Sequence, residues 1–147
     1  MILNFAKIRD VKTPIYSSTG AAGLDFFVPY DFKSYKLLPG ESILIPSGIK
    51  LNIPAGYALI GQNKSGIALK RNLRVASGVI DSDYQGEIHL HLNNFGLNEQ
   101  IIDPGDKIMQ FLVISVPKVT LLEINIDNLY NHSSNRGNNG FGSTGEK

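Results

Sequence analysis

The sequence contains no cysteine among its 147 residues. Disulfide bonds, zinc–thiolate sites and a cysteine nucleophile are therefore excluded. Charge is also scarce: 18% of the residues are charged and the net charge is +1, whereas an average globular protein has about 25% charged residues. A chain with so little charge does not attract duplex nucleic acid non-specifically, and we expect no direct nucleic-acid partner. The low charged fraction also agrees with a surface that other copies of the chain partly cover.

Long hydrophobic runs are missing as well. The longest, Phe111 to Val116, has the length of a strand, whereas a membrane span needs about 20 apolar residues. The amino terminus, MILNFAKIRD, lacks the apolar segment of a signal peptide. We therefore expect a soluble intracellular protein without membrane contact, cytoplasmic by default, and the sequence leaves a nuclear or viral origin open.

Short β-type runs separated by Gly and Pro turns fill most of the chain. The clearest is Glu87–Asn93, where Ile88, Leu90 and Leu92 alternate with polar residues. Only Ser65–Leu73 has spacing compatible with a helix. One domain with many short strands predicts an all-β sandwich, jelly roll or small barrel. The other expected strands are Asn4–Ile8, Glu41–Ile45, Ile49–Ile53, Tyr57–Ile60, Lys107–Val116 and Val119–Ile126.

The end of the chain has a different composition. Residues 127–147 are rich in Asn, Ser and Gly, so we expect an arm that follows a β-rich body over residues 1–126. In this arm, RGNNGFGSTG (136–145) buries too little to fold alone. Arg136, Ser143 and Thr144 suit phosphate oxygens, and Phe141 offers a flat face for a base. The segment is therefore either a tail that closes over a ligand or a loose terminus.

Residues 78–87, GVIDSDYQGE, predict a β-hairpin with carboxylates near its tip. Val79 and Ile80 end one strand, and a turn leads into the alternating strand. Asp81 is a candidate to activate a water, and Tyr84 a candidate to present a ring at the base of the hairpin. Asp and Ser are also frequent turn residues, so a purely structural hairpin is the alternative.

Three further segments carry candidate ligand contacts. Residues 63–66 (NKSG) follow a strand and open the helix, where they either bind an anion or only cap the helix. Asp25 lies in an apolar segment of small residues, as a turn residue or as a contact to hydrated Mg²⁺. Gln110 lies between Met109 and Phe111, as a satisfied core amide or a ligand contact.

Other catalytic patterns find little support. His89 and His91 form an H-x-H pair that could bind a metal, but no third ligand is visible. We interpret this strand face as exposed or covered by another subunit. The phosphate-binding pattern GxxxxGK[ST] does not occur. No nucleophile elbow is present, so a Ser-His-Asp triad cannot be argued.

Five segments resemble, in order and spacing, the motifs of the trimeric deoxyuridine triphosphatase (dUTPase) family. They are AAGLDF, KSGIALK, GVIDSDYQGE, GDKIMQF and RGNNGFGSTG, and together they span residues 21–145. The resemblance implies an all-β, jelly-roll-like barrel with one short helix and a flexible C-terminal arm. It also implies a homotrimer with shared active sites that hydrolyses dUTP to dUMP and pyrophosphate. This activity keeps uracil out of DNA and supplies dUMP for thymidylate synthesis.

The resemblance also implies a role for each matching residue. Asp81 is the general base that orients a water for attack on the α-phosphate, and Gln110 contacts phosphate and water. Tyr84 packs under the deoxyribose and leaves no room for a 2′-hydroxyl. Mg²⁺ is the implied cofactor, and Asp25 reaches it through water. The remaining implied contacts are Gly78, Val79, Ile80, His89 and Phe141 to uracil, and Lys64, Ser65, Gly66, Arg136, Gly142, Ser143 and Thr144 to the phosphates.

Two positions depart from the family's pattern. Lys64 stands where the second motif usually has Arg, and it lacks the planar fork of donors that Arg offers to phosphate. Asn139 stands where the fifth motif usually has the first of two glycines. Asn tolerates left-handed backbone better than most residues, so we expect the tail to close.

Alternative activities on this fold are dCTP deamination and nucleotide sensing without catalysis. Deaminases of this fold read cytosine and use a glutamate in place of the aspartate of GVIDSDY. Regulatory members often carry an insert between the fourth and fifth motifs, but Val113–Asn135 is short. A purely structural jelly roll would not need the hairpin acid together with the Phe-Gly-Ser-Thr tail.

Overall fold

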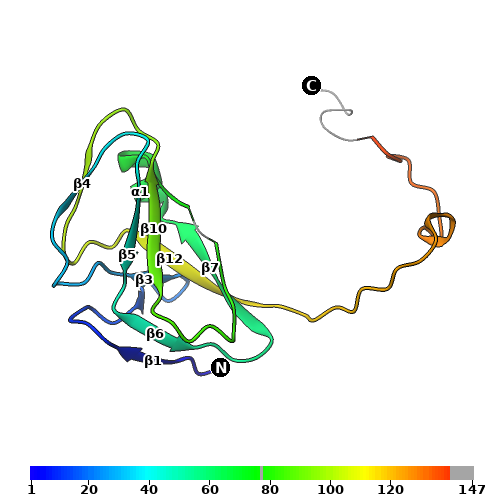
Figure 1. The fold of residues 1–147 in the computed structure, drawn as a ribbon, viewed down its shortest axis with the longest axis horizontal. Coiled ribbons are helices and arrows are strands. Elements are labelled where there is room, and N and C mark those ends of the chain that lie inside the picture. Colours follow the sequence, from blue (N-terminus) through cyan, green and yellow to red (C-terminus); the bar gives the residue numbers. More distant parts are fainter. Residues whose placement is uncertain (77, 140–147) are drawn as a thin grey trace. The chain divides into compact units, whose positions relative to one another are not determined.

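The computed structural model describes residues 1–76 and 78–139. The chain divides into two compact units, Met1–Pro117 and Lys118–Lys147. The described part of the first unit consists of twelve short strands and a single α-helix, α1 (Ser65–Arg71), which lies at one end of the strands (Figure 1). The strands are β1 (Asn4–Lys7), β2 (Ile15–Tyr16), β3 (Leu24–Phe26), β4 (Tyr35–Leu37), β5 (Ser42–Pro46), β6 (Ile49–Asn52), β7 (Tyr57–Asn63), β8 (Leu73–Val75), β9 (Val79–Ile80), β10 (His89–Asn94), β11 (Gln100–Ile102) and β12 (Met109–Ser115).

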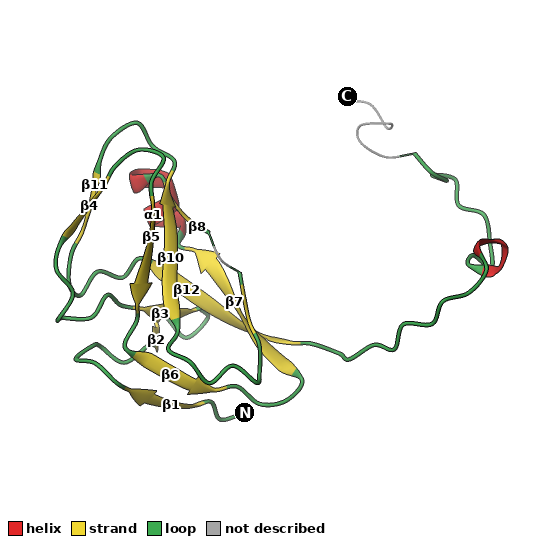
Figure 2. Ribbon diagram, viewed as in Figure 1, coloured by secondary structure: helices red, strands yellow, loops and turns green. Residues whose placement is uncertain are grey.

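The described strands pair antiparallel in four sheets (Figure 2). The largest has the order β2-β3-β12-β7-β9, so β12 is hydrogen-bonded to both β3 and β7. A second sheet has the order β5-β10-β8, and the pairs β1-β6 and β4-β11 complete the unit. Antiparallel sheets around one core form the jelly-roll-like fold that the sequence predicts.

The core lies between these sheets. Leu90 and Leu92 of β10 are at most 1% exposed, whereas His89 and His91 are half-buried on the other face, as the alternating pattern predicts. Phe111 packs edge to face with a second buried ring, Phe26, at 4.7 Å between ring centroids. Burial of a side chain of this size contributes about 1.5–3 kcal/mol.

The helix ends two residues earlier than the sequence pattern suggests. Asn72 adopts a left-handed backbone with φ 51° and terminates α1, and Leu73 already belongs to β8. Left-handed residues commonly end helices, and Asn tolerates this conformation. Lys64 precedes the helix with extended backbone, as expected for a residue at its start.

The prediction of a strand over Val119–Ile126 is wrong. Residues 118–125 form no strand, and Ile126–Asn128 form a single turn of 3₁₀ helix, whose Asp127 N–H donates to the Asn125 side chain at 2.9 Å. A strand needs a neighbour to satisfy its backbone groups, and the described part of the second unit offers none. The chain accordingly divides after Pro117 rather than after Ile126.

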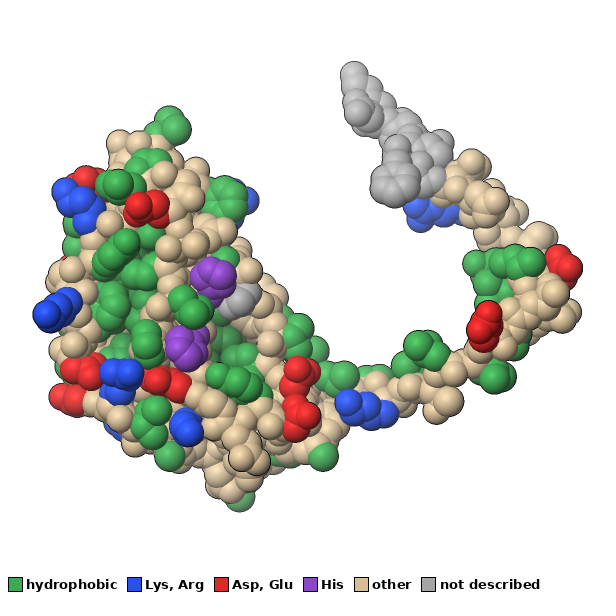
Figure 3. Space-filling view, in the orientation of Figure 1, with side chains coloured by type: hydrophobic (Ala, Val, Ile, Leu, Met, Phe, Trp, Pro, Cys, Tyr) green, Lys and Arg blue, Asp and Glu red, His purple; other side chains and the backbone are tan. Residues whose placement is uncertain are grey.

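Several apolar side chains remain on the surface of the first unit. Figure 3 shows them on the face that carries β4, β5 and β11. Among them, Tyr35 is 43% exposed, Leu44 58% and Ile101 44%. Across residues 1–76 and 78–139, no helix has the length and apolar character needed to cross a membrane.

Candidate active site

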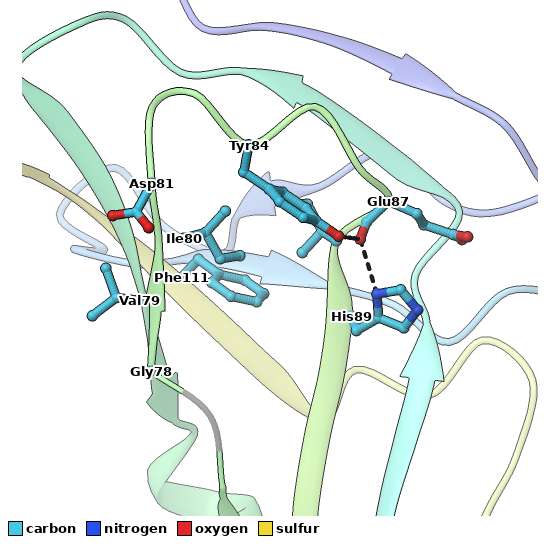
Figure 4. Close-up of a pocket in the computed structure, with 9 residues that line it drawn as sticks. Gly78, Val79, Ile80, Asp81, Tyr84, Glu87, His89 and Phe111 are labelled. Carbon is cyan, nitrogen blue, oxygen red and sulfur yellow. Dashed lines mark hydrogen bonds between the residues drawn. The ribbon is translucent and has the colours of Figure 1, made fainter.

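Two strands from different sheets frame a pocket at the predicted hairpin. β9 is the last strand of the five-stranded sheet, and β10 is the middle strand of the three-stranded sheet. The prediction of a paired β-hairpin is wrong, because β9 pairs with β7 and β10 pairs with β5 and β8. The turn between β9 and β10 is present, and the two unpaired strands leave a space of about 180 Å³ (Figure 4). We call this space the hairpin pocket. It is lined by Gly78, Val79, Ile80, Asp81, Tyr84, Glu87, Ile88, His89 and Phe111.

Backbone groups border the hairpin pocket on both sides. The Gly78 carbonyl accepts from the Gly61 N–H at 2.7 Å, which ties β9 to β7. The opposite edge of β9 has no strand partner among the described residues. The first residues of β10 pair only with β5, where His89 faces Pro46. Such strand edges suit a flat ligand with donors and acceptors along one side.

A single carbonyl joins two of the predicted residues. The Glu87 C=O accepts from the Tyr84 hydroxyl at 2.9 Å and lies 2.9 Å from His89 Nδ1 (Figure 4). A carbonyl can only accept, so His89 carries a proton on Nδ1. In the neutral ring, Nε2 is then an acceptor, and the orientation of the imidazole is set by this bond.

The Tyr84 ring also packs closely against Gly86. A Cβ atom at Gly86 would collide with the Tyr84 hydroxyl, so only glycine lets the ring lie across the return of the hairpin. The ring remains 43% exposed and presents a flat surface at the pocket. Its position therefore depends on the neighbouring backbone more than on core packing.

Asp81 lies at the end of the hairpin pocket opposite His89 (Figure 4). A turn closed by the Tyr84 N–H and the Asp81 carbonyl, 3.2 Å apart, holds the residue at the tip. Its side chain is exposed, and in the described part of the chain no donor binds its carboxylate. The carboxylate is thus free to accept a hydrogen bond from water.

Asp25 lies in a separate cluster of charges. It is 2% exposed on β3, and its carboxylate accepts from Lys64 Nζ and Ser17 Oγ. Lys107 Nζ lies 3.2 Å from Asp25 Oδ2 and donates to Ser17 at 2.7 Å. Burial raises the pKa of the Asp25 carboxyl, but the hydrogen bonds from Lys64, Ser17 and Lys107 outweigh burial and lower the pKa below its ordinary value.

The two lysines of this cluster border a second pocket, of about 440 Å³, at the start of α1. Gln110 also lines it, and its amide donates to the Asn63 carbonyl at 2.8 Å. A Cβ atom at Gly23 would lie 2.5 Å from Gln110 Oε1, so a side chain there would displace the Gln110 amide. We call this space the cationic pocket. It is lined by Lys64, Ser65, Gly66, Ile67, Lys70, Arg71, Lys107 and Gln110.

The structure thus sorts the predicted residues into groups. Gly78, Val79, Ile80, Asp81, Tyr84 and His89 line the hairpin pocket, and Lys64, Ser65, Gly66 and Gln110 line the cationic pocket beside Asp25. Arg136 belongs to the second unit, where its Nε donates to the Asn139 carbonyl at 2.8 Å. Phe141, Gly142, Ser143 and Thr144 lie outside the described residues.

Sequence reasoning missed several contributors, among them Ser17, Glu87, Lys107 and Phe111. Glu87 and Lys107 stand within motifs that were singled out, and their charge was the available signal. Phe111 reads as an ordinary core residue, and Ser17 as an ordinary loop residue. Only the folded chain brings Glu87, Lys107 and Phe111 to the pockets and Ser17 to Asp25.

Comparison with known proteins shows which family the chain resembles. The family model described as dUTPase matches residues 9–145. The deoxyuridine 5'-triphosphate nucleotidohydrolase of Chlamydia felis is 37% identical over 139 residues, 93% of each chain. A dUTPase of Staphylococcus bacteriophage 80alpha, solved with dUpNHpp, has a TM-score of 0.86 at 22% identity over 98% of each chain. That of S. aureus phage phi11, solved with a structural Mg(II) ion, has a TM-score of 0.75 at 20% identity, covering 84% of this chain and 97% of its own.

Proposed function

The chain belongs to the dUTPase family and is a dUTP diphosphatase, which splits dUTP into dUMP and pyrophosphate, and from this premise we propose how its residues bind and attack the nucleotide. The observation that carries the proposal is the hairpin pocket, with its bordering strand edges, its fixed Tyr84 ring and its free Asp81 carboxylate. Hydrolysis of dUTP keeps uracil out of DNA and supplies dUMP for thymidylate synthesis.

Uracil binds in the hairpin pocket. Backbone groups of Gly78, Val79, Ile80 and His89 pair with the polar edge of the base, as a complementary base would. The strand edges of β9 and β10 support this role, because their strand pairing leaves the pocket side of each edge free among the described residues. Phe141, which lies outside the described residues, stacks over the base.

Tyr84 packs under the deoxyribose and excludes a 2′-hydroxyl. Two observations support this role: the hydroxyl of Tyr84 is tied to the Glu87 carbonyl, and the ring lies against Gly86. A ring held at both points cannot move aside for an additional oxygen. Discrimination against ribonucleotides is then a steric property of the pocket.

Asp81 acts as the general base. Its carboxylate takes a proton from water, and the resulting hydroxide attacks the α-phosphorus in line with the bridging oxygen. The bond from the α-phosphorus to that oxygen breaks, and pyrophosphate leaves with the oxygen and the bonding electron pair. Base catalysis by a positioned carboxylate typically contributes about 10²–10⁴-fold.

The triphosphate binds in the cationic pocket. Lys64 and Lys107 supply positive charge, Ser65 and Gly66 supply hydrogen-bond donors at the start of α1, and Gln110 contacts phosphate and the attacking water. Arg136, Gly142, Ser143 and Thr144 complete the phosphate contacts from the C-terminal segment. Lys64 replaces the usual Arg as a point charge whose direction is set by Asp25.

Mg²⁺ fits this site as a companion of the substrate. Among the described residues, no group of three or more His, Cys, Asp or Glu side chains could hold a metal ion. Asp25 has about four acceptor positions and uses three of them for Lys64, Ser17 and Lys107, so one acceptor position remains for a water bound to the metal. When bound, Mg²⁺ neutralises phosphate charge.

The active sites are shared within a homotrimer. Adjacent residues of β12 support this arrangement: Phe111 lines the hairpin pocket, whereas Gln110 lines the cationic pocket. Neighbouring side chains of a strand point to opposite faces, and this separation of the two pockets supports sites that are completed by another copy. The exposed apolar side chains on β4, β5 and β11 support contact with further copies. Light scattering should give three times the chain mass of 16.1 kDa.

One experiment tests the activity and its specificity. Pyrophosphate release should be measured in parallel with dUTP, UTP, dTTP and dCTP, each with Mg²⁺ and with a chelator. We expect release from dUTP with Mg²⁺ and much less from the other nucleotides. Ammonia release from dCTP would instead identify a deaminase, and dUTP binding without turnover would identify a regulator.

A further inference from the structure

The side chain of Glu87 points away from the hairpin pocket and is anchored elsewhere. It is 15% exposed, and its Oε1 atom accepts two hydrogen bonds. One comes from Arg9 Nε at 2.9 Å and the other from the Gly48 N–H at 2.7 Å. The return of the hairpin is thus bound at one oxygen to two segments that are distant in the sequence.

Arg9 connects Glu87 to a second carboxylate outside the hairpin, that of Asp31. Its guanidinium also donates through NH1 to Asp31 Oδ2 at 3.2 Å, so it bridges two carboxylates. The planar fork of an arginine offers separate N–H groups to the two carboxylates, in a fixed geometry that the single ammonium of a lysine lacks. The Arg9 guanidinium is therefore held between the carboxylates of Glu87 and Asp31.

Gly48 permits the close approach. It has φ +74°, and an added Cβ would lie 2.9 Å from Arg9 Cβ and 3.0 Å from Val11 Cγ1. A side chain at this position would be strained by its backbone and would displace Arg9. The Gly48 carbonyl accepts from the Ile8 N–H at 2.8 Å, so both backbone groups of this residue are engaged.

The backbone of Glu87 faces the opposite way. Its carbonyl accepts from the Tyr84 hydroxyl and from His89 Nδ1, both at 2.9 Å (Figure 4). We propose that Glu87, anchored by Arg9 and Gly48, is a positioning residue that sets the geometry of base and sugar recognition. This inference rests on the proposed function of the hairpin pocket. Arg9 and Gly48 lie outside all five motifs, and neither touches the pocket.

Loss of the anchor should affect binding and selectivity more than chemistry. If Glu87 shifts, the Tyr84 ring and the His89 imidazole lose their common acceptor, whereas the Asp81 turn keeps its own backbone bond. For Glu87→Ala we expect roughly a tenfold higher KM for dUTP, corresponding to the loss of one hydrogen bond to a charged group. We also expect a lower ratio of dUTP to UTP hydrolysis and a kcat within about twofold of the unaltered protein.

The test combines kinetics with spectroscopy on the full chain. Glu87→Ala, Arg9→Ala and the double variant are compared with Glu99→Ala, which breaks the surface ion pair Lys36–Glu99 and serves as the matched control. We expect Arg9→Ala to change KM and selectivity in the same direction as Glu87→Ala but less, and the double variant to resemble Glu87→Ala. The ¹⁵N shifts of the His89 ring should show loss of the fixed Nδ1–H tautomer in the single variant Glu87→Ala and also in the double variant.

Several outcomes would overturn the inference. The first is an unchanged KM for dUTP and an unchanged ratio of dUTP to UTP hydrolysis in a folded Glu87→Ala. The second is a change in KM in the double variant that equals the sum of the two single changes. The third is a change in kcat without a change in KM. If Glu87→Ala does not fold, Arg9→Ala decides by the same criteria, because Arg9 is 38% exposed in its side chain. Failure of the unaltered protein to release pyrophosphate from dUTP would instead refute the proposed function, and the His89 shifts would still test the anchor.

Discussion

Gln110 and Phe111 are neighbours in β12, yet they line different pockets. Gln110 donates to the Asn63 carbonyl at the cationic pocket, and Phe111 packs on Phe26 beneath the hairpin pocket. The alternation of a strand thus separates the hairpin pocket, where we propose that the base binds, from the cationic pocket, where we propose that the phosphates bind. In the proposed homotrimer, a complete site combines the hairpin pocket of one copy with the cationic pocket of another.

Mixed oligomers test this division. Asp81→Asn damages the hairpin half and Gln110→Ala the cationic half, so each variant alone should be nearly inactive. When both are unfolded together and refolded at equal amounts, random assembly should restore about one quarter of the sites, because half of the hairpins and half of the cationic pockets are intact. Pyrophosphate release from dUTP measures the recovery. Activity no higher than that of the separately refolded variants would contradict shared sites.

Asp81→Asn should separate binding from hydrolysis. The amide cannot take a proton from water, so we expect kcat to fall by about 10²-fold or more while binding of dUpNHpp is retained. Calorimetry measures the binding and pyrophosphate release the rate. Asp83→Asn, two residues along the same turn, is the control and should keep near-native kcat. Near-native kcat in Asp81→Asn would remove Asp81 from the role of base.

Asp25→Asn should weaken the fold and alter its response to acid. The pKa of Asp25 is lowered in the folded protein, so the charged carboxylate stabilises the fold above its ordinary pKa of about 3.9. That contribution disappears as the pH falls through the lowered pKa. We expect the variant to lose about 1–3 kcal/mol at pH 7 and to show a smaller further loss below pH 4 than the unaltered protein.

Urea unfolding at pH 7, 4 and 3 measures this difference. The control is again Asp83→Asn, because Asp83 is exposed and has no ion pair among the described residues. An acid response of Asp25→Asn equal to that of the unaltered protein would show that the cluster with Lys64 and Lys107 contributes no stability.

Mg²⁺ should bind with the nucleotide and not before it. Asp25 is surrounded by two ammonium groups, which repel a free cation. Calorimetric titration of the free protein with Mg²⁺ should therefore give no binding at millimolar concentration, whereas the protein with dUpNHpp should bind the ion. Tight binding of Mg²⁺ by the nucleotide-free protein would contradict the proposed arrangement.

A chain that ends at Asn135 should fold and assemble normally but hydrolyse dUTP slowly. The first unit ends at Pro117 and carries the described core, so the shorter chain keeps its stability. It lacks Arg136 and the segment around Phe141, which we expect to close the site. A chain that ends at Gly145 is the control. Unchanged kcat in the shorter chain would refute a role of the segment in catalysis.

The sequence predicts some strands of the structure and misses others. The pattern of β10 appears directly in the sequence, because Leu90 and Leu92 alternate with polar residues. β2, β3, β4, β8 and β11 have two or three residues each, too few for a periodic signal. The run Val119–Ile126 has strand-like residues but no partner in the described second unit, so propensity alone misled there.

The amino-acid sequence by itself determined the fold class and supplied the candidate site residues, because apolar alternation and the five motifs are local properties of the chain. Only the tertiary structure decided which of these residues share a pocket. Asp25 meets Lys64 and Lys107, and Glu87 meets Arg9 and Gly48, through pairings between strands and turns that are far apart in the sequence. Such contacts depend on register and burial, which a linear pattern does not contain.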